Sequence, residues 1–461
     1  MCARIFRIVL FISIFAQISF GQQAKRGSNW ALGFWPVVTF DFNSSLQIDT
    51  LVNVNAMYLG SCISETTGSL LFYSAGFIVV NSDGILLENG NKINSPYGTV
   101  LCDYLGGGSN FPQTSIILPR KGNQYYVFST GVSDSIALNW LNQVTDLEFD
   151  VLNYSIVDMD SNAGKGKVIE KNKVLADKQH YFNVALHAVK HANGRDWWLL
   201  KADCNFNRYQ EFLVREDTIL GPFYLYPPVM GDFCTWKGTL KFSNDGRLFA
   251  SSMYGTLYSN PVIYDHNRVD LYDFDRCDGT INFRNYYMVP YDINSFPSLD
   301  YKFGICFSPN DNLLYMSNKF TVYQIDVHDT SMNNAILIHG PDTTMPNFPW
   351  YDQMEVAPDG RLYIGNFNGT RKYMSYIDSP NVRGLGCAFR PQGLWQPYTN
   401  LKSPPNMPNY GLGPDNSKPC WPLNLSESGE SAAVEEWVIY PNPAQTQVTM
   451  RARRSKRTLT T

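Results

Sequence analysis

A recurring unit, in which a polar turn leads into a short aromatic strand, is the feature that most constrains how this chain can fold. The clearest copy lies at residues 357–366, where a Pro-Asp-Gly turn precedes Leu362, Tyr363 and Ile364, whose alternation is typical of a half-buried strand. The copies recur roughly every 50 to 70 residues, a spacing that indicates a propeller or a solenoid. The other copies lie at residues 67–73, 121–127, 192–198, 243–249 and 308–315.

The composition favours strands over helices. Aromatic residues make up 14% of the sequence, and turn-forming Gly, Asn, Asp and Pro are plentiful. No capped run of helical periodicity is evident in the middle of the chain. We therefore predict an all-β fold, a six- to seven-bladed β-propeller over residues 29–420, because radial closure hides the edges of its sheets.

The number of blades depends on how the strands are grouped. At four strands per blade and roughly 55 residues per unit, this span holds seven blades, although six also fit. Three segments each read as a strand with an aspartate near its end. We interpret them as outer strands of successive blades; they lie at residues 154–159, 269–274 and 322–327.

Charge is unevenly distributed along the chain, whose net value is −4. Arg4 and Arg7 lie in the first 21 residues and five cations lie within residues 451–461, which leaves residues 22–450 at −11. So acidic a body argues against nucleic acid or an anionic membrane as the partner. A short basic run at a terminus is usually solvated.

Residues 1–21 have the features of a secretory signal peptide. Arg4 and Arg7 precede an apolar run at residues 8–15, and small residues stand near the expected cleavage site. The apolar run is shorter than a membrane span requires, so we predict cleavage and an exported protein that does not span the membrane. Cys2 precedes the apolar run, where it cannot serve as the acylated cysteine of a lipoprotein.

Eight of the nine cysteines follow the predicted cleavage site, an even number that permits disulfides in an exported protein. The sequence does not choose among the possible pairings. None of the eight lies in a Cys-x-x-Cys pair or beside a histidine at zinc-ligand spacing, so we predict some disulfides and some buried thiols. The eight are Cys62, Cys102, Cys204, Cys234, Cys277, Cys306, Cys387 and Cys420.

Two polar clusters match metal sites only in part. His187 and His191 are four residues apart, but their neighbours predict a strand, a turn and a strand, in which histidines have structural roles. In the acidic run at residues 270–278, Cys277 stands where a calcium loop that starts at Asp273 needs a carboxylate. We predict an aspartate-capped turn there, and we predict no metal, no cofactor and no catalytic residue.

Other catalytic signatures are weak or absent. The glycines at residues 106–108 lack the Lys-Ser/Thr of a phosphate-binding loop, and no Gly-x-Ser-x-Gly is present. The paired carboxylates of glycosidases cannot be recognised from spacing. Exposed tryptophans can stack on sugar rings, although in a propeller they also pack between blades. The candidates are Trp197, Trp198, Trp236, Trp350 and Trp395.

Four strings, at residues 191–198, 272–277, 379–387 and 408–414, carry a family resemblance. They resemble exported β-propeller proteins of Bacteroidetes-type bacteria, which often precede immunoglobulin-like repeats or a C-terminal sorting domain. The resemblance covers most of residues 29–420. It implies a fold and an export route, and it implies no particular activity.

The chain changes character after Cys420. Residues 421–436 are rich in Ser, Glu and Ala, which is typical of a linker. Residues 437–461 are similar to the opening of the sorting domain that the type IX secretion system recognises. The similarity is carried by Tyr440, Pro441, Asn442, Pro443 and Ala444, followed by a strand at residues 447–450.

This sorting domain is expected to be truncated. After the strand at residues 447–450 the chain enters the basic run at residues 451–457, and one strand cannot form a sheet of its own. We therefore expect this chain to remain in the periplasm if the short tail is not functional, and otherwise to be secreted or displayed on the cell surface.

The sequence thus favours a secreted or cell-surface β-propeller that acts as a non-catalytic binding or scaffold module, exported by a type IX-like route. The expected partners are the secretion machinery and a protein or carbohydrate ligand on a propeller face. Two alternatives stay open: a hydrolase or lyase acting on a polysaccharide at the central channel, and a structural component of surface or gliding machinery. An enzyme should bring two carboxylates, or a histidine and an acid, together in a pocket.

Overall fold

In the computed structural model the chain divides into two units, Met1–Cys420 and Trp421–Thr461, which we describe separately. No helix among the described residues is both long and apolar enough to cross a membrane. The predicted signal peptide and three of the cysteines, Cys102, Cys204 and Cys234, lie outside the described residues. The structure describes residues 25–33, 36–52, 60–94, 113–143, 149–176, 185–203, 208–227, 238–255, 266–289, 304–318, 320–332, 334–341, 350–366, 371–400, 404–417, 420, 435–440 and 449–454.

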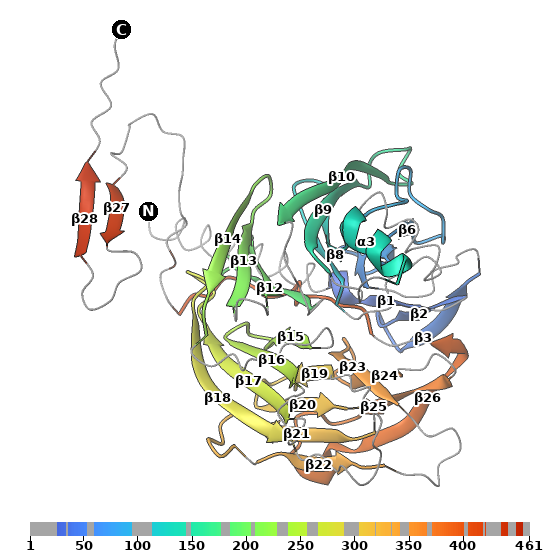
Figure 1. The fold of residues 1–461 in the computed structure, drawn as a ribbon. Coiled ribbons are helices and arrows are strands. Elements are labelled where there is room, and N and C mark those ends of the chain that lie inside the picture. The colour runs from blue at the N-terminus through green and yellow to red at the C-terminus, as the bar shows by residue number, and fades with distance from the viewer. Residues whose placement is uncertain are drawn as a thin grey trace, which may run out of the picture. The chain divides into compact units, whose positions relative to one another are not determined.

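The described part of the first unit is a β-propeller of seven antiparallel sheets, called blades 1 to 7 in chain order (Figure 1). This confirms the predicted fold class and gives seven blades. Blade 1 contains β1 (Asn29–Leu32), β2 (Val37–Asp41) and β3 (Gln47–Leu51), and blade 2 contains β4 (Ser61–Ser64), β5 (Leu70–Ser74) and β6 (Val79–Asn81). Blade 3 contains β7 (Ser115–Pro119), β8 (Gln124–Gly131), β9 (Val151–Asp158) and β10 (Lys167–Ala176).

The remaining four blades each have four strands. Blade 4 contains β11 (Leu186–Lys190), β12 (Trp197–Asp203), β13 (Arg208–Val214) and β14 (Ile219–Leu225), and blade 5 contains β15 (Thr239–Phe242), β16 (Leu248–Gly255), β17 (His266–Phe274) and β18 (Ile281–Val289). Blade 6 contains β19 (Gly304–Phe307), β20 (Leu313–Ser317), β21 (Val322–Asp326) and β22 (Ile336–His339), and blade 7 contains β23 (Tyr351–Val356), β24 (Leu362–Asn366), β25 (Arg371–Ile377) and β26 (Phe389–Asn400).

The first strand of each blade is its innermost strand. Seven such strands contact their neighbours in succession around a central channel, from β1 and β4 through β7, β11, β15 and β19 to β23. The ring closes between blades 7 and 1, where the Tyr363 ring packs edge-on against Trp30 and Phe40, with centroids 5.7 and 6.3 Å away. No strand is exchanged at this junction among the described residues, because β23 to β26 are consecutive.

The six predicted turns all join the first strand to the second, in blades 2 to 7. In five of them a glycine has a positive φ, and at Gly246 (φ 72°) a Cβ would lie 2.7 Å from Cγ2 of Val189. In blade 6 Asp311 takes this conformation instead (φ 60°). Its carboxylate accepts hydrogen bonds from the backbone N–H groups of Asn244 and Asp245, which joins the turns of blades 5 and 6.

The three strands that end near an aspartate are β9, β17 and β21, which are the third strands of their blades and not the outermost ones as predicted. The recurring aspartate has a local reason. Asp158 and Asp326 accept hydrogen bonds from backbone N–H groups two residues further on, and Asp275, just after β17, accepts one from Cys277. The aspartates therefore stabilise the turn into the fourth strand.

One helix, α3 (Asp134–Leu141), lies between β8 and β9, where the sequence predicted none. Ser133 precedes it as N-cap with an extended backbone, and Asp134 lies in its first turn, close to the positive end of the helix dipole. Only Ala137 is buried along the helix, so its hydrophobic periodicity is too weak to be recognised in the sequence.

The described part of the second unit is a two-stranded antiparallel hairpin of β27 (Glu435–Tyr440) and β28 (Thr449–Arg454). The sequence predicted a single strand at residues 447–450, with residues 421–436 as linker. The register of the two strands places Glu435 opposite Arg454 and Glu436 opposite Arg453.

Candidate functional site

The central channel of the propeller contains part of the same chain. After β26, residues 404–417, here called the channel segment, cross the middle of the ring (Figure 1). Asn406 anchors the segment at the beginning of three inner strands. Its backbone N–H donates to the carbonyl oxygen of Gly60 at 2.8 Å, and its Nδ2 donates to those of Ser115 at 2.9 Å and Leu186 at 2.8 Å. One side chain thereby joins blades 3 and 4.

Tyr410 continues this attachment further along the channel. Its hydroxyl donates to the carbonyl oxygen of Ile117 at 2.8 Å, and its ring packs edge-on against Trp197. Its own carbonyl accepts from Nζ of Lys190 at 2.8 Å. Burial raises the pKa of Tyr410 well above 10, and burial, with Arg26 and Arg276 nearby, lowers that of Lys190 to about 8. These two hydrogen bonds join Tyr410 of the channel segment to blades 3 and 4.

The segment leaves the channel between the first turns of blades 4 and 5. The backbone N–H of Asp415 donates to the carbonyl oxygen of Ala192, and the Asp415 carboxylate pairs with Arg247 at 3.2 Å. Arg276 donates to the carbonyl oxygens of Gly413 at 2.6 Å and Lys190 at 2.8 Å. The guanidinium, which is 5% exposed, thus holds the segment against blade 4.

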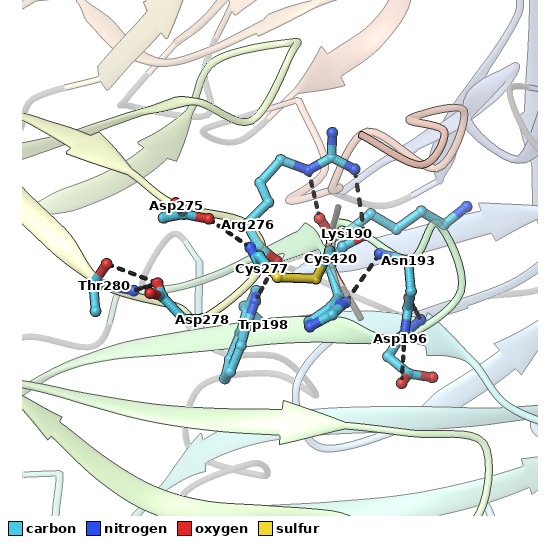
Figure 2. The surroundings of a disulfide bond; sticks show 11 residues. Lys190, Asn193, Asp196, Trp198, Asp275, Arg276, Cys277, Asp278, Thr280 and Cys420 are labelled. Carbon is cyan, nitrogen blue, oxygen red and sulfur yellow. Dashed lines mark hydrogen bonds between the residues drawn. A yellow bond between two sulfur atoms is a disulfide. The ribbon is translucent and has the colours of Figure 1, made fainter. Parts of the chain in front are cut away.

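A disulfide between Cys277 and Cys420 fixes the end of the segment (Figure 2). Cys277 lies in the turn between β17 and β18, where Asp275 accepts its backbone N–H and Trp198 Nε1 donates to the carbonyl oxygen of Arg276 at 2.9 Å. The bond closes a loop of 143 residues. Three cysteines among the described residues, Cys62, Cys306 and Cys387, are buried free thiols.

Beside the channel segment lies a cavity of about 360 Å³, here called the channel cavity. Its wall comes from η1 (Lys25–Gly27), the inner strands of blades 1, 4, 5 and 7, the first turns of blades 5 and 7, and residues 407–410 of the channel segment. Of its lining residues, Pro358 and Asn409 are exposed, whereas Phe242 and Met407 are buried.

An ion pair lines this cavity. Nζ of Lys241, on β15, lies 2.5 Å from Oε2 of Glu355, on β23, so the pair spans from blade 5 to blade 7. Both side chains are largely buried, at 9% and 14% exposure. Burial alone would lower the pKa of Lys241, but the Glu355 carboxylate outweighs it and raises that pKa above its usual value. Burial, only partly offset by Lys241, also raises the pKa of Glu355. At 2.5 Å the two charges balance one another when both groups are ionised.

His187, on β11, also lines the cavity and is 2% exposed. Burial, together with the charge of Lys241, lowers its pKa well below 6.5, so the imidazole is neutral. Neither ring nitrogen makes a hydrogen bond of good geometry, although backbone groups of Ala188 and Met407 lie close enough to oppose part of this shift. His187 and Glu355 thus line one cavity without forming the hydrogen-bonded pair that a general base requires.

The structure places the predicted polar clusters in turns and strands. His191 follows β11, and its Nδ1 accepts the backbone N–H of Asn193 at 3.0 Å. In the acidic run, Asp278 accepts the backbone N–H of Thr280, which makes the cluster an aspartate-capped turn. No group of three or more His, Cys, Asp or Glu residues in the described ranges could hold a metal ion.

The tryptophans expected to be exposed differ widely. Trp197 and Trp198 are 3% and 5% exposed, so the hypothesis that they stack on sugar is wrong. They point to opposite faces of β12, and both faces are buried: Trp197 packs against Tyr410, and Trp198 packs against His191. Trp350 is partly buried, and only Trp395, at 56%, fits the expectation, while Trp236 lies outside the described residues.

The residues that build the channel are largely ones that the sequence did not single out: Asn406, Tyr410, Lys241 and Glu355. The one available signal was the run of prolines at residues 404, 405, 408 and 414, which predicts an extended segment that cannot be a central strand. In the sorting motif, Tyr440 ends β27, and Pro441, Asn442, Pro443 and Ala444 lie outside the described residues.

No protein-family model matches this chain, and no curated protein matches it. It is similar to a functionally unknown protein from Desulfotomaculum acetoxidans, at 9% identity and a TM-score of 0.44, over 82% of this chain and 99% of that chain. It is also similar to hydrazine synthase from Kuenenia stuttgartiensis (12% identity, 74% and 89% covered, TM-score 0.42) and to a periplasmic gluconolactonase from Pseudomonas aeruginosa (10% identity, 82% and 97% covered, TM-score 0.37). Similarities this weak carry no argument about function.

Proposed function

We propose that this protein is an exported, non-catalytic β-propeller that serves as a binding or scaffold module. The observation that carries the proposal is the channel segment, which crosses the channel and is anchored by Asn406, by Tyr410 and by the disulfide of Cys420. A polysaccharide cannot be threaded through a channel that already holds this segment. The propeller therefore offers its outer faces and one small cavity to partners.

The chemistry of the channel cavity supports the same proposal. Glycoside hydrolysis usually requires two carboxyl groups on either side of the scissile bond. Glu355 is the one carboxylate among the residues that line the cavity, and it is paired with Lys241. Acid-base catalysis by His187 would need a carboxylate or another side chain that orients the ring, and no side chain forms a hydrogen bond with its ring nitrogens.

Export is proposed on two grounds. Disulfides form and persist in oxidising compartments outside the cytosol, and Cys277 is bonded to Cys420. The motif from Tyr440 to Ala444 is similar to type IX sorting signals, and it stands in a unit separate from the propeller. We therefore propose a type IX-like route with the second unit as its signal.

Turnover measurements test the non-catalytic role. Purified protein should release no product from polysaccharides, esters or phosphoesters, either as isolated or as the Cys420→Ser variant, in which the end of the channel segment is no longer tethered. A product that disappears in the Glu355→Gln variant would contradict the proposal and favour a hydrolase or lyase. Product formed by Cys420→Ser alone would also contradict it, because the segment would then be an inhibitor of an enzyme.

Cell fractionation tests the route. The full chain and a chain lacking residues 435–461 are expressed in a host with a type IX system, and both are located by immunoblotting of periplasm, surface and medium. We expect the shortened chain to accumulate in the periplasm and the full chain to move beyond it. The same distribution for both chains would contradict a sorting role for the second unit.

A further inference from the structure

The channel cavity has the dimensions of a small-molecule site. Its volume of about 360 Å³ falls within the usual range for such sites. Its lining includes the exposed residues Pro358 and Asn409 as well as buried residues such as Met407. A cavity of this volume suits one compact unit of a ligand.

The charges of the wall favour a neutral occupant. Lys241 and Glu355 balance one another at 2.5 Å. A cation or an anion placed beside them would add a buried charge without a counter-charge, which is costly. An ammonium has three N–H donors, and one of those of Lys241 goes to Glu355. The pair therefore offers polar contacts to an uncharged ligand.

Two further polar groups on the wall lack partners. His187 is neutral and so carries one donor and one acceptor nitrogen, and neither makes a hydrogen bond of good geometry, although backbone groups of Ala188 and Met407 lie nearby. Nε1 of Trp30, a donor, has no hydrogen-bond partner. Both side chains are at least 98% buried, being 2% and 0% exposed. Buried polar groups without partners destabilise a protein, so a hydrogen-bonding molecule that reached them would stabilise it.

Apolar side chains complete the wall. Phe242 of blade 5, together with Met407 and Tyr410 of the channel segment, presents rings and a thioether beside the polar groups. A hydroxylated ring matches this combination, because its hydroxyls both donate and accept while its C–H faces pack against aromatic rings. We propose that the channel cavity binds one neutral, polyhydroxylated ring of monosaccharide size, either a free sugar or the terminal residue of a glycan. This rests on the proposed binding function.

The first experiment uses the full mature chain and free D-glucose, D-galactose and D-mannose as probes. Saturation-transfer NMR and thermal-shift measurements should detect binding of at least one of them. Glucuronate, which has the same ring with a negative charge, should bind at least about tenfold more weakly than glucose. Binding of glucuronate alone, or of no neutral sugar, would overturn the proposal, as would a high-resolution structure in which sugar-soaked crystals hold only water in the cavity.

Two variants connect binding to the cavity. The double variant Lys241→Met/Glu355→Met removes the polar pair without leaving an unpaired charge, and it should weaken sugar binding about tenfold or more. The matched control is Asp203→Asn/Arg208→Met, which removes another largely buried pair, with Nε and Oδ2 at 2.7 Å, from the second and third strands of blade 4. Equal loss in both variants would overturn the assignment of the site.

The variant His187→Leu tests two effects together, on the melting temperature of the sugar-free protein and on the shift that sugar produces. A residue with a structural role alone would not change the second. Replacing an unpartnered buried imidazole by an apolar side chain should raise the melting temperature of the sugar-free protein. The same variant should reduce the shift that the sugar produces. An unchanged sugar-induced shift would exclude His187 from the site.

Glycan arrays separate the two sources of the ligand. Capture of glycans that share one terminal sugar, with competition by that free sugar, indicates a terminal residue, whereas binding of free sugar without capture indicates a monosaccharide. Failure of this inference is distinct from failure of the proposed function. A sugar that binds and is converted to product leaves the site in place and refutes the non-catalytic role, whereas an inert protein that binds no sugar refutes only the site.

Discussion

The hydroxyl of Tyr410 donates a hydrogen bond to the carbonyl oxygen of Ile117 at 2.8 Å, although the two residues lie 293 positions apart in the chain. Blade 3 is thereby joined to a segment that follows blade 7. Many ring-shaped folds are closed at the junction of their first and last blades alone. In this protein the channel segment adds a second connection, from the end of the last blade to the inner strands of blades 2 to 4.

Asn406 should contribute strongly to stability. Asn406→Ala removes the Nδ2 donor and leaves the carbonyl oxygens of Ser115 and Leu186 without it in a buried place. An unsatisfied buried group costs about 1–3 kcal/mol, so we expect a loss of about 2–5 kcal/mol in the free energy of unfolding, measured by urea denaturation.

Asn285→Ala provides the control, because Nδ2 of Asn285 donates to the carbonyl oxygen of Thr330 at an exposed position. Its cost should stay below about 1 kcal/mol. Similar costs for both variants would show that the channel segment is not held by Asn406.

The disulfide should raise the free energy of unfolding of the propeller, because it closes a long loop of the chain. Cys420→Ser opens a loop of 143 residues, and the loss of a native disulfide typically costs about 2–5 kcal/mol. Cys277→Ser should cost a similar amount. The double variant should cost no more than either single one, because both remove the same bond. Additive costs would contradict the pairing of Cys277 with Cys420.

The Lys241–Glu355 pair should behave as a unit. Lys241→Met leaves a largely buried carboxylate without its partner, and such a change typically costs about 3–5 kcal/mol. In Lys241→Met/Glu355→Met no charge remains, so the stability should return to within about 1–2 kcal/mol of the original. A double-mutant cycle by chemical denaturation measures the difference.

Arg247→Ala supplies the comparison for that cycle. Arg247 pairs with Asp415, but its side chain is 55% exposed. Solvent screens such a pair, and its loss should cost less than about 1 kcal/mol. A small cost for Lys241→Met as well would indicate that the cavity is more hydrated than its burial implies.

Glu211 should make stability depend on pH. This residue of β13 is 2% exposed, and burial, with Asp278 as a smaller cause, raises its pKa from 4.5 to about 9. Folding therefore favours the protonated acid. Its contribution is complete below pH 4.5 and is lost as the pH rises toward 9, by up to about 1.4 kcal/mol per pH unit.

Glu211→Gln should remove this dependence. The stability difference between Glu211→Gln and the unchanged protein should grow in favour of the variant from about pH 4.5 to 9. Thermal unfolding across that range measures it. Parallel profiles for Glu211→Gln and the unchanged protein would contradict a raised pKa.

The repeated turns made the propeller predictable from sequence. Each of the six recognised units coincides with the turn between the first two strands of a blade, because these turns need a residue with positive φ and therefore use Gly or Asp. The seventh unit was not recognised. Residues 33–36 of blade 1 read Gly-Phe-Trp-Pro and contain no polar turn residue, which is why six and seven blades both fitted.

The channel could not be predicted in the same way. Asn406 contacts Ser115 and Leu186, which are 291 and 220 positions away, and no local pattern marks a contact over such separations. Likewise, Lys241 and Glu355 are ordinary surface-type residues in sequence, and only closure of the ring brings them together. A turn is determined by a few consecutive residues and can be recognised in the sequence, whereas the site forms only when blades that are distant in the sequence come together.

The position of the channel segment after the last blade also bears on how the protein is made. A chain that emerges from its N-terminus has all seven blades before it has Asn406 and Tyr410. A nascent chain whose seven blades closed before this segment arrived would leave the carbonyl groups of Gly60, Ser115 and Leu186 to bind water. Expulsion of that water, when the segment arrives, is the step that distinguishes the finished molecule from its precursors.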